Sequence, residues 1–541
     1  MPKSVRPKFL LPISLTLAWT FDYLFWGKAI GISFPIFALL VIGVGLWFVY
    51  RSGQKPARNS MLLLIPIIFF VLVSVVRLEG FTLFLALVLT FLLMAVFALT
   101  LLGGRWPAYS FSDYFVKLLL LFPRGLGLVR STAPAEKKGE RSGLRRLAPI
   151  ARGLFLALPL LWFLGLLLSA ADPVFARVLE DFFAFLNIDN FIEYVFRTFY
   201  ILILAYLLAG AFLFARFKSK KEDVLGQNDS VMKPFLGFGE AATVLASVNM
   251  LFAAFVFVQL RYFFGGAANI NNAGFTYAEY ARRGFGEMVT VASVSLFLFL
   301  ALSSVIKRAA PRQQRWFSWL GVTLMLLVSI ILVSAYQRLL LYESAYGFTR
   351  LRTYSHIFMV WLGLLLLAVV IFELLNRRRA VVFATLMAAL GFSASLALLN
   401  VDAFIVRANF ERPGFGEETA SAAGSRSEEV AVDVGYLVWL SPDAMVGFDS
   451  AYDRALQQGE TDLATQIAGA AFCHALIHDD FRQAGAWQGW HFSPILADNA
   501  WSRIKAQPHY QDLNIEVISL SDLQITVDDR DSGCGYFQGW D

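Results

Sequence analysis

Long apolar stretches, separated by polar connections, fill the first three quarters of the chain. A helix needs about 20 mostly apolar residues to cross the hydrocarbon core of a bilayer. A helix also satisfies its own backbone hydrogen bonds, which lipid cannot do. The pattern therefore predicts a transmembrane domain over residues 1–412 with about eleven spanning helices. The expected spans are Phe9–Trp26, Ala29–Tyr50, Met61–Val76, Phe81–Leu102, Gly153–Ala170, Thr198–Phe217, Gly239–Leu260, Met288–Ile306, Trp316–Ala335, His356–Leu375 and Val381–Leu399.

The connections between these spans differ in charge, and the basic ones alternate with mixed or acidic ones. Lysine and arginine close to span ends stay on the cytoplasmic side of a membrane. With eleven spans every basic cluster falls on one side, which predicts a cytoplasmic N-terminus and an extracytoplasmic region after the last span. The basic clusters lie at 3–8, 51–58, 105–152, 216–221, 307–315 and 377–379.

Two segments outside the spans are expected to contact the membrane surface. Phe111–Phe122 is apolar but too short to cross, and we expect an interfacial helix that ends at Pro123. The basic loop 130–152 can bind anionic lipid headgroups, with about 1 kcal/mol for each basic residue near the surface. The alternative is an ordinary solvated cytoplasmic loop. On the other side, the phenylalanine-rich stretch Pro173–Leu186 is expected to lie along the membrane.

The pattern changes after the last span. Residues 413–429 are rich in Gly, Ser, Ala and Glu, a composition typical of a flexible linker. Residues 430–541 predict a small soluble α+β domain, so the fold class is mainly α with a helical membrane bundle and this C-terminal domain. Its expected elements are helices Asp443–Gln458 and Thr461–Ile477 and strands Asn514–Leu520 and Leu523–Val527.

Charge separates the same two regions. Of the 541 residues, 58% are hydrophobic and only 16% are charged, fewer than in a soluble protein. Basic residues exceed acidic ones by 20 up to Arg412, whereas acidic residues exceed basic ones by 14 beyond it. The overall charge of +6 is therefore no sign of nucleic-acid binding, because the soluble region is acidic.

Two predicted hairpins carry the most charged and aromatic side chains on the extracytoplasmic side. Helical spacing places side chains four residues apart on one face, within reach of one another. One interpretation is that the hairpins form a cleft for an anionic headgroup or a sugar. The alternative is a salt-bridged cap that holds the helix ends and docks the soluble domain. The candidate residues are Arg338, Tyr342, Glu343, Tyr346, Arg350 and Arg352 in one hairpin and Glu279, Arg283 and Glu287 in the other.

Strongly polar residues inside the predicted spans are few: Asp22, Glu240, Asn249 and Gln259. Charge inside a membrane marks a functional site by default. Asp22 and Glu240 lie near span ends, where water is expected to reach them. No series of acidic residues crosses the membrane, so the pattern only weakly favours a proton-driven transporter.

The C-terminal region offers few candidates for chemistry. Cys473 and Cys534 can form a disulfide outside the cytoplasm, and two buried thiols are the alternative. His474 and His478 are four residues apart but lack the further ligands of a zinc site, so no metal and no cofactor are predicted. Three tryptophans are expected to lie in the core rather than to form a sugar platform, namely Trp487, Trp490 and Trp501.

Several motifs resemble a family of bacterial multi-pass membrane proteins known as domain of unknown function 4173, related to 4153. They are FDYLFWGKAIGI, TYAEYARRGFGE, LYESAYGFTRLRTY, NVDAFIVRANFER and YLVWLSPDA, with a weaker likeness at AWQGWHFS. The resemblance implies an inner-membrane protein with an exported C-terminal domain. It implies no activity and no catalytic residues, and this chain has His491 where the family's tryptophan motif has Asn.

Three functions are consistent with these features. The first is a non-enzymatic envelope sensor or assembly partner whose exported domain binds a protein. The second is a transporter or lipid flippase, which needs a polar path between helices. The third is a membrane enzyme acting on a lipid-linked sugar, although Gly27 and Lys28 leave almost no loop near Asp22 for the carboxylate that such enzymes use.

Overall fold

The computed structural model describes residues 10–132, 191–220, 235–263, 285–307, 310–375, 377–412, 434–478, 486–519, 524–527 and 530–531, with part of 153–178. The helices up to residue 412 are α1 Leu10–Phe25, α2 Ser33–Tyr50, α3 Arg58–Leu62, α4 Leu64–Val76, α5 Gly80–Thr100, α6 Phe111–Thr132, α9 Phe191–Phe217, α10 Phe238–Phe263, α13 Phe285–Val305, α14 Pro311–Tyr346, α15 Arg350–Leu374, α16 Arg378–Leu399 and α17 Val401–Phe410, with the 3₁₀ turn η1 Trp106–Ala108.

Nine helical segments of the described residues are long and apolar enough to cross a membrane, and each coincides with a predicted span. The chain is therefore a multi-pass membrane protein. Of the two remaining predicted spans, the first corresponds to the shorter apolar helix α1. The other, Gly153–Ala170, falls on a stretch described only in part, so the total of eleven stays a prediction.

Helix α6 is longer than the sequence predicts, whereas α14 continues beyond its span to Tyr346, as the helical spacing of Arg338, Tyr342 and Tyr346 predicts. Helix α6 continues through Pro123 to Thr132, so the expectation that it ends at Pro123 is wrong. Proline removes one backbone hydrogen bond and tolerates a bend, but it does not have to end a helix. Helix α14 begins with Pro311 at its first position and ends at Tyr346, and it is followed by Gly347, whose φ of 72° suits glycine.

The described residues divide into two compact units: residues 1–23 with 122–214, and residues 24–121 with 215–541. In the first unit, Asp22 of α1 is buried and forms an ion pair with Arg197 of α9, with 3.0 Å between Oδ1 and Nε. Tyr200 also donates to Asp22, and Glu193 contacts Arg197 from the preceding turn. The expectation that water reaches Asp22 is wrong in the structure, because α9 covers it.

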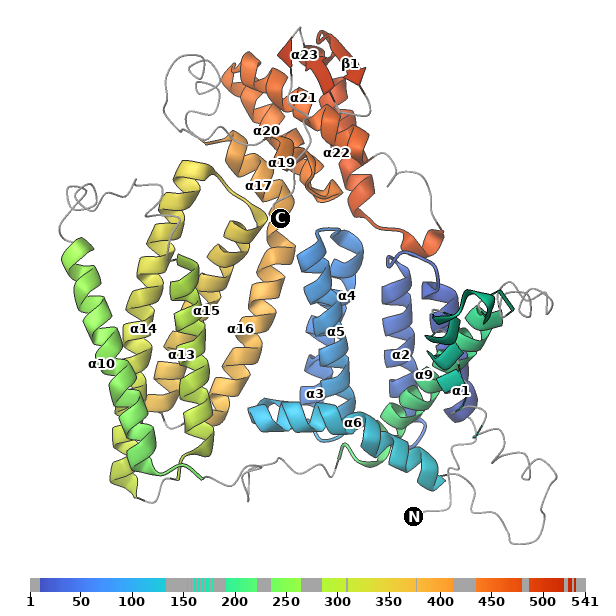
Figure 1. Ribbon diagram of the computed structural model, residues 1–541, viewed down its shortest axis with the longest axis vertical. Helices are drawn as coiled ribbons and strands as arrows, with labels where there is room; N and C mark the ends of the chain where they lie inside the picture. The colour runs from blue at the N-terminus through green and yellow to red at the C-terminus, as the bar shows by residue number, and fades with distance from the viewer. Residues whose placement is uncertain are drawn as a thin grey trace. The chain divides into compact units, whose positions relative to one another are not determined.

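The second unit contains two helical cores up to residue 412. In one, α14 packs against α10, α13 and α15. The Phe299 and Phe317 rings stack there at 5.8 Å, and a Cβ on Gly321 would overlap Phe299. In the other core α2, α4, α5 and η1 pack with α16, which adjoins α15 (Figure 1). A small residue at a helix contact lets neighbouring side chains approach closely.

A third core joins α17 to the helices after residue 433. These elements are α19 Val434–Val438, the 3₁₀ turn η2 Pro442–Ala444, α20 Met445–Gln458, α21 Thr461–Ile477, the 3₁₀ turn η4 Trp487–Gly489, α22 Ser493–Ala506, α23 Pro508–Gln511 and strands β1 Ile515–Ser519, β2 Gln524–Val527 and β3 Arg530–Asp531. Helices α20 and α21 and strands β1 and β2 lie within a few residues of the elements predicted here. The three strands form one antiparallel sheet in sequence order, and Ile515 pairs with Val527.

Helix α17 belongs to this third core although it precedes the predicted linker. Asn400, with φ 52°, separates α17 from α16, and its side chain accepts a hydrogen bond from the Ala403 N–H. Helix α20 then crosses α17 so closely that a Cβ on Gly447 would lie 2.4 Å from the Ala403 carbonyl oxygen. Residues 413–429 lie outside the described residues, and residues on both sides of them share one core.

Candidate functional site

The α14–α15 hairpin holds most residues of the predicted cleft. Arg352 lies over the Tyr342 ring at 4.0 Å and near the Tyr346 ring at 5.9 Å. Its Nη1 also donates to the carbonyl oxygens of Tyr346 and Gly347 at 2.9 and 2.5 Å. The last carbonyls of a helix lack partners within the helix. Arg352 therefore caps α14, and its cation–π and hydrogen-bond contacts are made within the hairpin.

Glu343 faces a partner that the sequence reasoning missed. It is 2% exposed, and its Oε2 lies 3.2 Å from His356 Nδ1 on α15. The Tyr336 hydroxyl contacts the other ring nitrogen of His356, so tyrosine, imidazole and carboxylate form a chain. Glu343 Oε1 is buried with no hydrogen-bond partner among the described residues. Tyr336 and Glu343 lie two turns apart on α14, a spacing that could have indicated a shared face.

The side chain of Arg350, the first residue of α15, contacts α17 rather than α14. Its guanidinium makes a bidentate pair with Asp402, with 2.8 Å from Nε to Oδ1 and 2.6 Å from Nη2 to Oδ2. Asp402 has no exposed surface, and its Oδ2 also accepts from the Ser441 N–H and hydroxyl. The backbone N–H of Arg350 donates to the Tyr436 hydroxyl at 2.8 Å. One arginine at the start of α15 thus contacts both α17 and the segment around α19.

Asp443 makes a second set of contacts, toward the turn between α4 and α5. Its Oδ2 accepts from the N–H groups of Leu78 and Glu79 at 2.8 and 3.0 Å. Its Oδ1 accepts from the Ser493 hydroxyl at 2.7 Å and lies 4.0 Å from Arg77 Nη1. A side chain of η2 therefore satisfies backbone donors between two membrane helices and contacts the start of α22.

Glu79 connects the two sets of contacts. Its carboxylate accepts from the Phe81 and Thr82 N–H groups at the start of α5, both at 2.8 Å, and from the Tyr354 hydroxyl of α15. Five charged residues make the contacts described above, and we call them the junction network. They are Arg77, Glu79, Arg350, Asp402 and Asp443.

The junction network lies in a medium of low polarity. Burial raises the pKa of Asp443, although hydrogen bonds from Ser493 and Leu78 and the charge of Arg77 oppose the shift. Burial also lowers the pKa of Arg77, and Asp443 opposes that shift. Both shifts arise because burial penalises the charged form. Each charge in such a site requires its partner, since an unpaired buried charge is costly.

A further contact lies between the tryptophan motif and the ends of α2 and α4. The Ile32 N–H donates to the Trp490 carbonyl at 2.9 Å, and the Phe492 N–H donates to the Val75 carbonyl at 2.8 Å. His491 Nε2 contacts the Ile30 carbonyl at 2.6 Å, and burial lowers the pKa of His491. A Cβ on Gly31 would lie 2.5 Å from the Gly489 carbonyl carbon, so the two backbones touch.

The tryptophans of the C-terminal region divide into two groups. Trp501 is buried in the third core, as predicted. Trp487 and Trp490 are 51% and 44% exposed, so the expectation that they lie in the core is wrong. The backbone of their segment is held against α2 and α4, which leaves both indole rings partly outside.

The structure describes only some of the remaining predicted residues. Arg338 is half-buried on α14, and Glu287 is exposed at the start of α13. Glu279 and Arg283 lie outside the described residues, so the meeting of the two hairpins stays a prediction. The same holds for the disulfide: Cys473 is buried and is not a free thiol, and Cys534 lies outside the described residues. Most of the basic loop 130–152 also lies outside them.

Within the described residues, no three His, Cys, Asp or Glu side chains converge as metal ligands. The two candidate histidines instead contact backbone carbonyl oxygens of the preceding segment. His474 Nδ1 lies 2.9 Å from the Val438 oxygen, and His478 Nε2 lies 2.7 Å from the Leu440 oxygen. Burial lowers the pKa of His478, which favours the neutral ring in this position.

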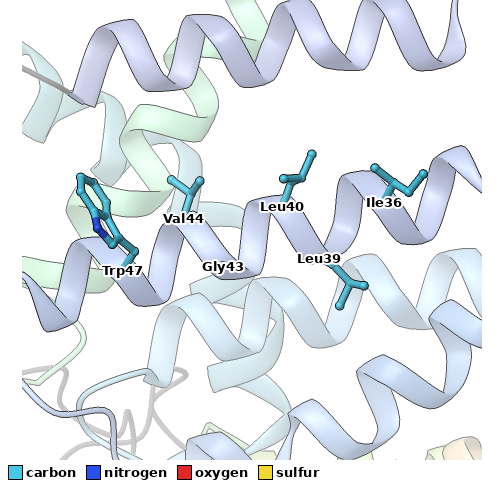
Figure 2. Close-up of a pocket in the computed structure, with 6 residues that line it drawn as sticks. All are labelled: Ile36, Leu39, Leu40, Gly43, Val44 and Trp47. Carbon is cyan, nitrogen blue, oxygen red and sulfur yellow. The ribbon is translucent and has the colours of Figure 1, made fainter.

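An apolar pocket of about 510 Å³ is lined by side chains of α2, and Figure 2 shows Ile36, Leu40, Val44 and Trp47 on one side of the helix and Leu39 on the other. Its lining is apolar except for one indole nitrogen, and it offers no group for catalysis. A surface of this kind on a spanning helix suits acyl chains or another helix. The lining residues are Ile36, Leu39, Leu40, Gly43, Val44 and Trp47.

The long apolar helical segments of the described residues and the buried carboxylates define a class: a multi-pass membrane protein whose C-terminal helices are joined to its membrane helices by ion pairs and hydrogen bonds to buried carboxylates. The family model described as Domain of unknown function (DUF4153) matches residues 64–451, more than half of the chain, and the chain belongs to this family. This match confirms the relationship that the sequence motifs implied. All five residues of the junction network lie within the matched range. No curated protein and no solved structure matches the chain.

Replacing Arg350 with alanine should destabilise the protein strongly. Asp402 would stay buried without its guanidinium partner, and loss of hydrogen bonds to a charged group costs about 1.5–3 kcal/mol when, as here, the arginine is one third exposed. Thermal unfolding of the purified protein in nanodiscs measures the loss. Arg454→Ala is the matched control, because its pair with Glu411 is partly exposed and should cost at most about 1 kcal/mol. Equal losses in the two variants would contradict a buried, essential pair.

Acid should loosen the contact between the tryptophan motif and α2. The pKa of His491 is lower in the folded state than in the unfolded state, where it is about 6.5. The stabilising effect of the neutral ring is therefore complete above about pH 6.5 and is lost as the pH falls through the folded-state pKa. His491→Asn keeps a donor for the Ile30 carbonyl but does not titrate, so its melting temperature should fall less on acidification. Identical pH profiles for both proteins would disprove this role.

Proposed function

We propose that the chain is a non-enzymatic protein of the bacterial inner membrane, an envelope sensor or assembly partner. Its N-terminus is in the cytoplasm, and its C-terminal helices lie outside and bind another protein. The sidedness follows from the basic clusters at alternate span ends. The inner membrane follows from the family resemblance.

The junction network is the observation that carries this proposal. A partner that shifts η2 or α17 acts directly on Asp443 or Asp402. Those carboxylates contact the start of α15 and the turn before α5 through Arg350 and the Leu78 and Glu79 N–H groups. Bidentate hydrogen bonds between arginine and a carboxylate require a specific geometry, so a small displacement weakens them, whereas apolar packing has no such directional requirement. Binding outside would thereby be coupled to two membrane helices.

Charge indicates the kind of partner. The region beyond Arg412 carries 14 more acidic than basic residues, so a protein with a basic surface suits it. Gln457 at the end of α20 and Thr461 at the start of α21 are exposed and uncharged. They offer positions at which a probe leaves the core of this region intact.

Photocrosslinking in intact cells tests the proposal. A photoreactive amino acid at Gln457 or Thr461 should yield one protein adduct of defined size, and the same residue at Leu364, an exposed position on the spanning helix α15, should not. The adduct should weaken at raised salt, because complementary charge is screened. Arg350→Ala should keep the adduct and abolish any change in hydrogen exchange at α15 that the adduct causes. Absence of an adduct, or an alkaline phosphatase fused after Asp541 that is inactive, would reject the proposal.

A second candidate, a proton-coupled transporter, is favoured by the Tyr336–His356–Glu343 chain. An imidazole between a phenol and a buried carboxylate can pass a proton from one to the other. Ionisable groups of this kind within spans mark ion pathways in membrane proteins. The sequence did not indicate this group of three side chains, because it forms only through contacts between α14 and α15.

Glu343→Gln tests this second function. The proteins are reconstituted in proteoliposomes that contain a pH dye, and candidate substrates are added together with a pH gradient. The dye should report proton movement across the membrane with the native protein and none with the variant. Glu373→Gln is the control, because Glu373 is buried at the other end of α15 beside Ser318. Equal proton movement in all three proteins, or none in any, would remove the transporter reading.

A further inference from the structure

The tryptophan motif exposes several large apolar side chains beside the membrane helices. The side chains of Trp487, Trp490 and Phe492 are 51%, 44% and 41% exposed. Ile495 and Ile30 are exposed to a similar extent. Several exposed large apolar side chains within one short segment indicate an interaction site in a region that is otherwise acidic.

Backbone contacts fix the depth of this surface. The Trp490 carbonyl accepts from Ile32, one residue before α2 begins, and the Phe492 N–H donates to Val75, one residue before α4 ends. Both helices belong to segments that are long and apolar enough to cross the membrane. Their ends therefore lie near the boundary between hydrocarbon and water, and so does the motif bound to them.

The chemistry of the motif suits that boundary. Tryptophan has an apolar ring and one polar N–H, and it is enriched where acyl chains meet headgroups. Residues 486–495 contain no Asp, Glu, Lys or Arg, although the surrounding region carries a large excess of acidic residues. An uncharged stretch can approach anionic headgroups without repulsion. The Trp490 and Phe492 rings also contact each other edge to face at 6.3 Å, which presents them together.

We infer that residues 486–495 form an interfacial anchor, in which Trp487, Trp490 and Phe492 lie among the headgroups and upper acyl chains of phospholipids of the membrane that the bundle crosses. The anchor is a second attachment of the C-terminal helices, to lipid rather than to protein. It depends on the spanning helices and not on the binding of a protein partner.

Photocrosslinking to lipid tests the anchor with the full chain. Benzoylphenylalanine replaces Phe492 or Trp490 with little change of shape, and the variants are irradiated in vesicles of phosphatidylethanolamine and phosphatidylglycerol. Mass spectrometry should find lipid attached at both positions, at least several times more than at Gln511. Gln511 is an exposed control on α23, which Figure 1 shows at the end of the C-terminal region farther from α4 and α5.

The outcomes separate lipid from other occupants. No lipid adduct above the Gln511 control would overturn the inference, and so would a dominant protein adduct at these positions in intact cells. A second measurement does not depend on photochemistry. The gain in melting temperature on transfer from detergent to lipid nanodiscs should be smaller for the Trp487→Ala/Trp490→Ala variant than for the native protein. An equal gain would also count against the anchor.

Discussion

The fully buried carboxylate of Asp402 is the constraint on which the rest of the junction depends. A carboxylate without water requires donors on both oxygens, and here Arg350 at the start of α15 and Ser441 just before η2 supply them. These donors can meet the carboxylate only if α15, α17 and the segment before η2 adopt one arrangement. Apolar packing of the same helices would tolerate small rotations and shifts. The ion pair selects among those arrangements, and it places η2 where Asp443 reaches the α4–α5 turn.

The C-terminal region is packed directly against the helices that precede residue 413 and is not a separate domain on a linker. Its helices share a core with α17, which follows α16 after the single residue Asn400. Residues before and after 413–429 therefore fold against each other, whatever path the intervening chain takes. Gly447 shows how close this packing is, because any side chain there would meet the backbone of α17. The family match, which runs from α4 into α20, covers the same combination of elements.

The spans could be predicted because their signal is local. Twenty apolar residues in succession indicate a helix without knowledge of any neighbour, and the boundaries of α21 follow equally from its own sequence. The partners of the candidate residues could not be predicted in the same way. Glu343 had Arg350 and Arg352 nearby in sequence, yet it pairs with His356, while Arg350 pairs with Asp402 some fifty residues away. Sequence spacing says which side chains share a face of one helix, but it does not say which helix comes to meet that face.

The tryptophan motif shows a different kind of wrong prediction. Trp487 and Trp490 were predicted to lie in a core, and they are partly exposed. In a soluble domain a large aromatic side chain gains most by burial in protein. Beside a membrane, the interface offers an alternative environment, and Trp487 and Trp490 remain partly exposed while their backbone is bound. The two attachments of the C-terminal helices thus respond to different variables. The junction network responds to charge and protonation, and the aromatic segment responds to the lipid around α2 and α4. A region held in both ways can report a change in either, because loss of one attachment leaves the other to restrict how far the helices move.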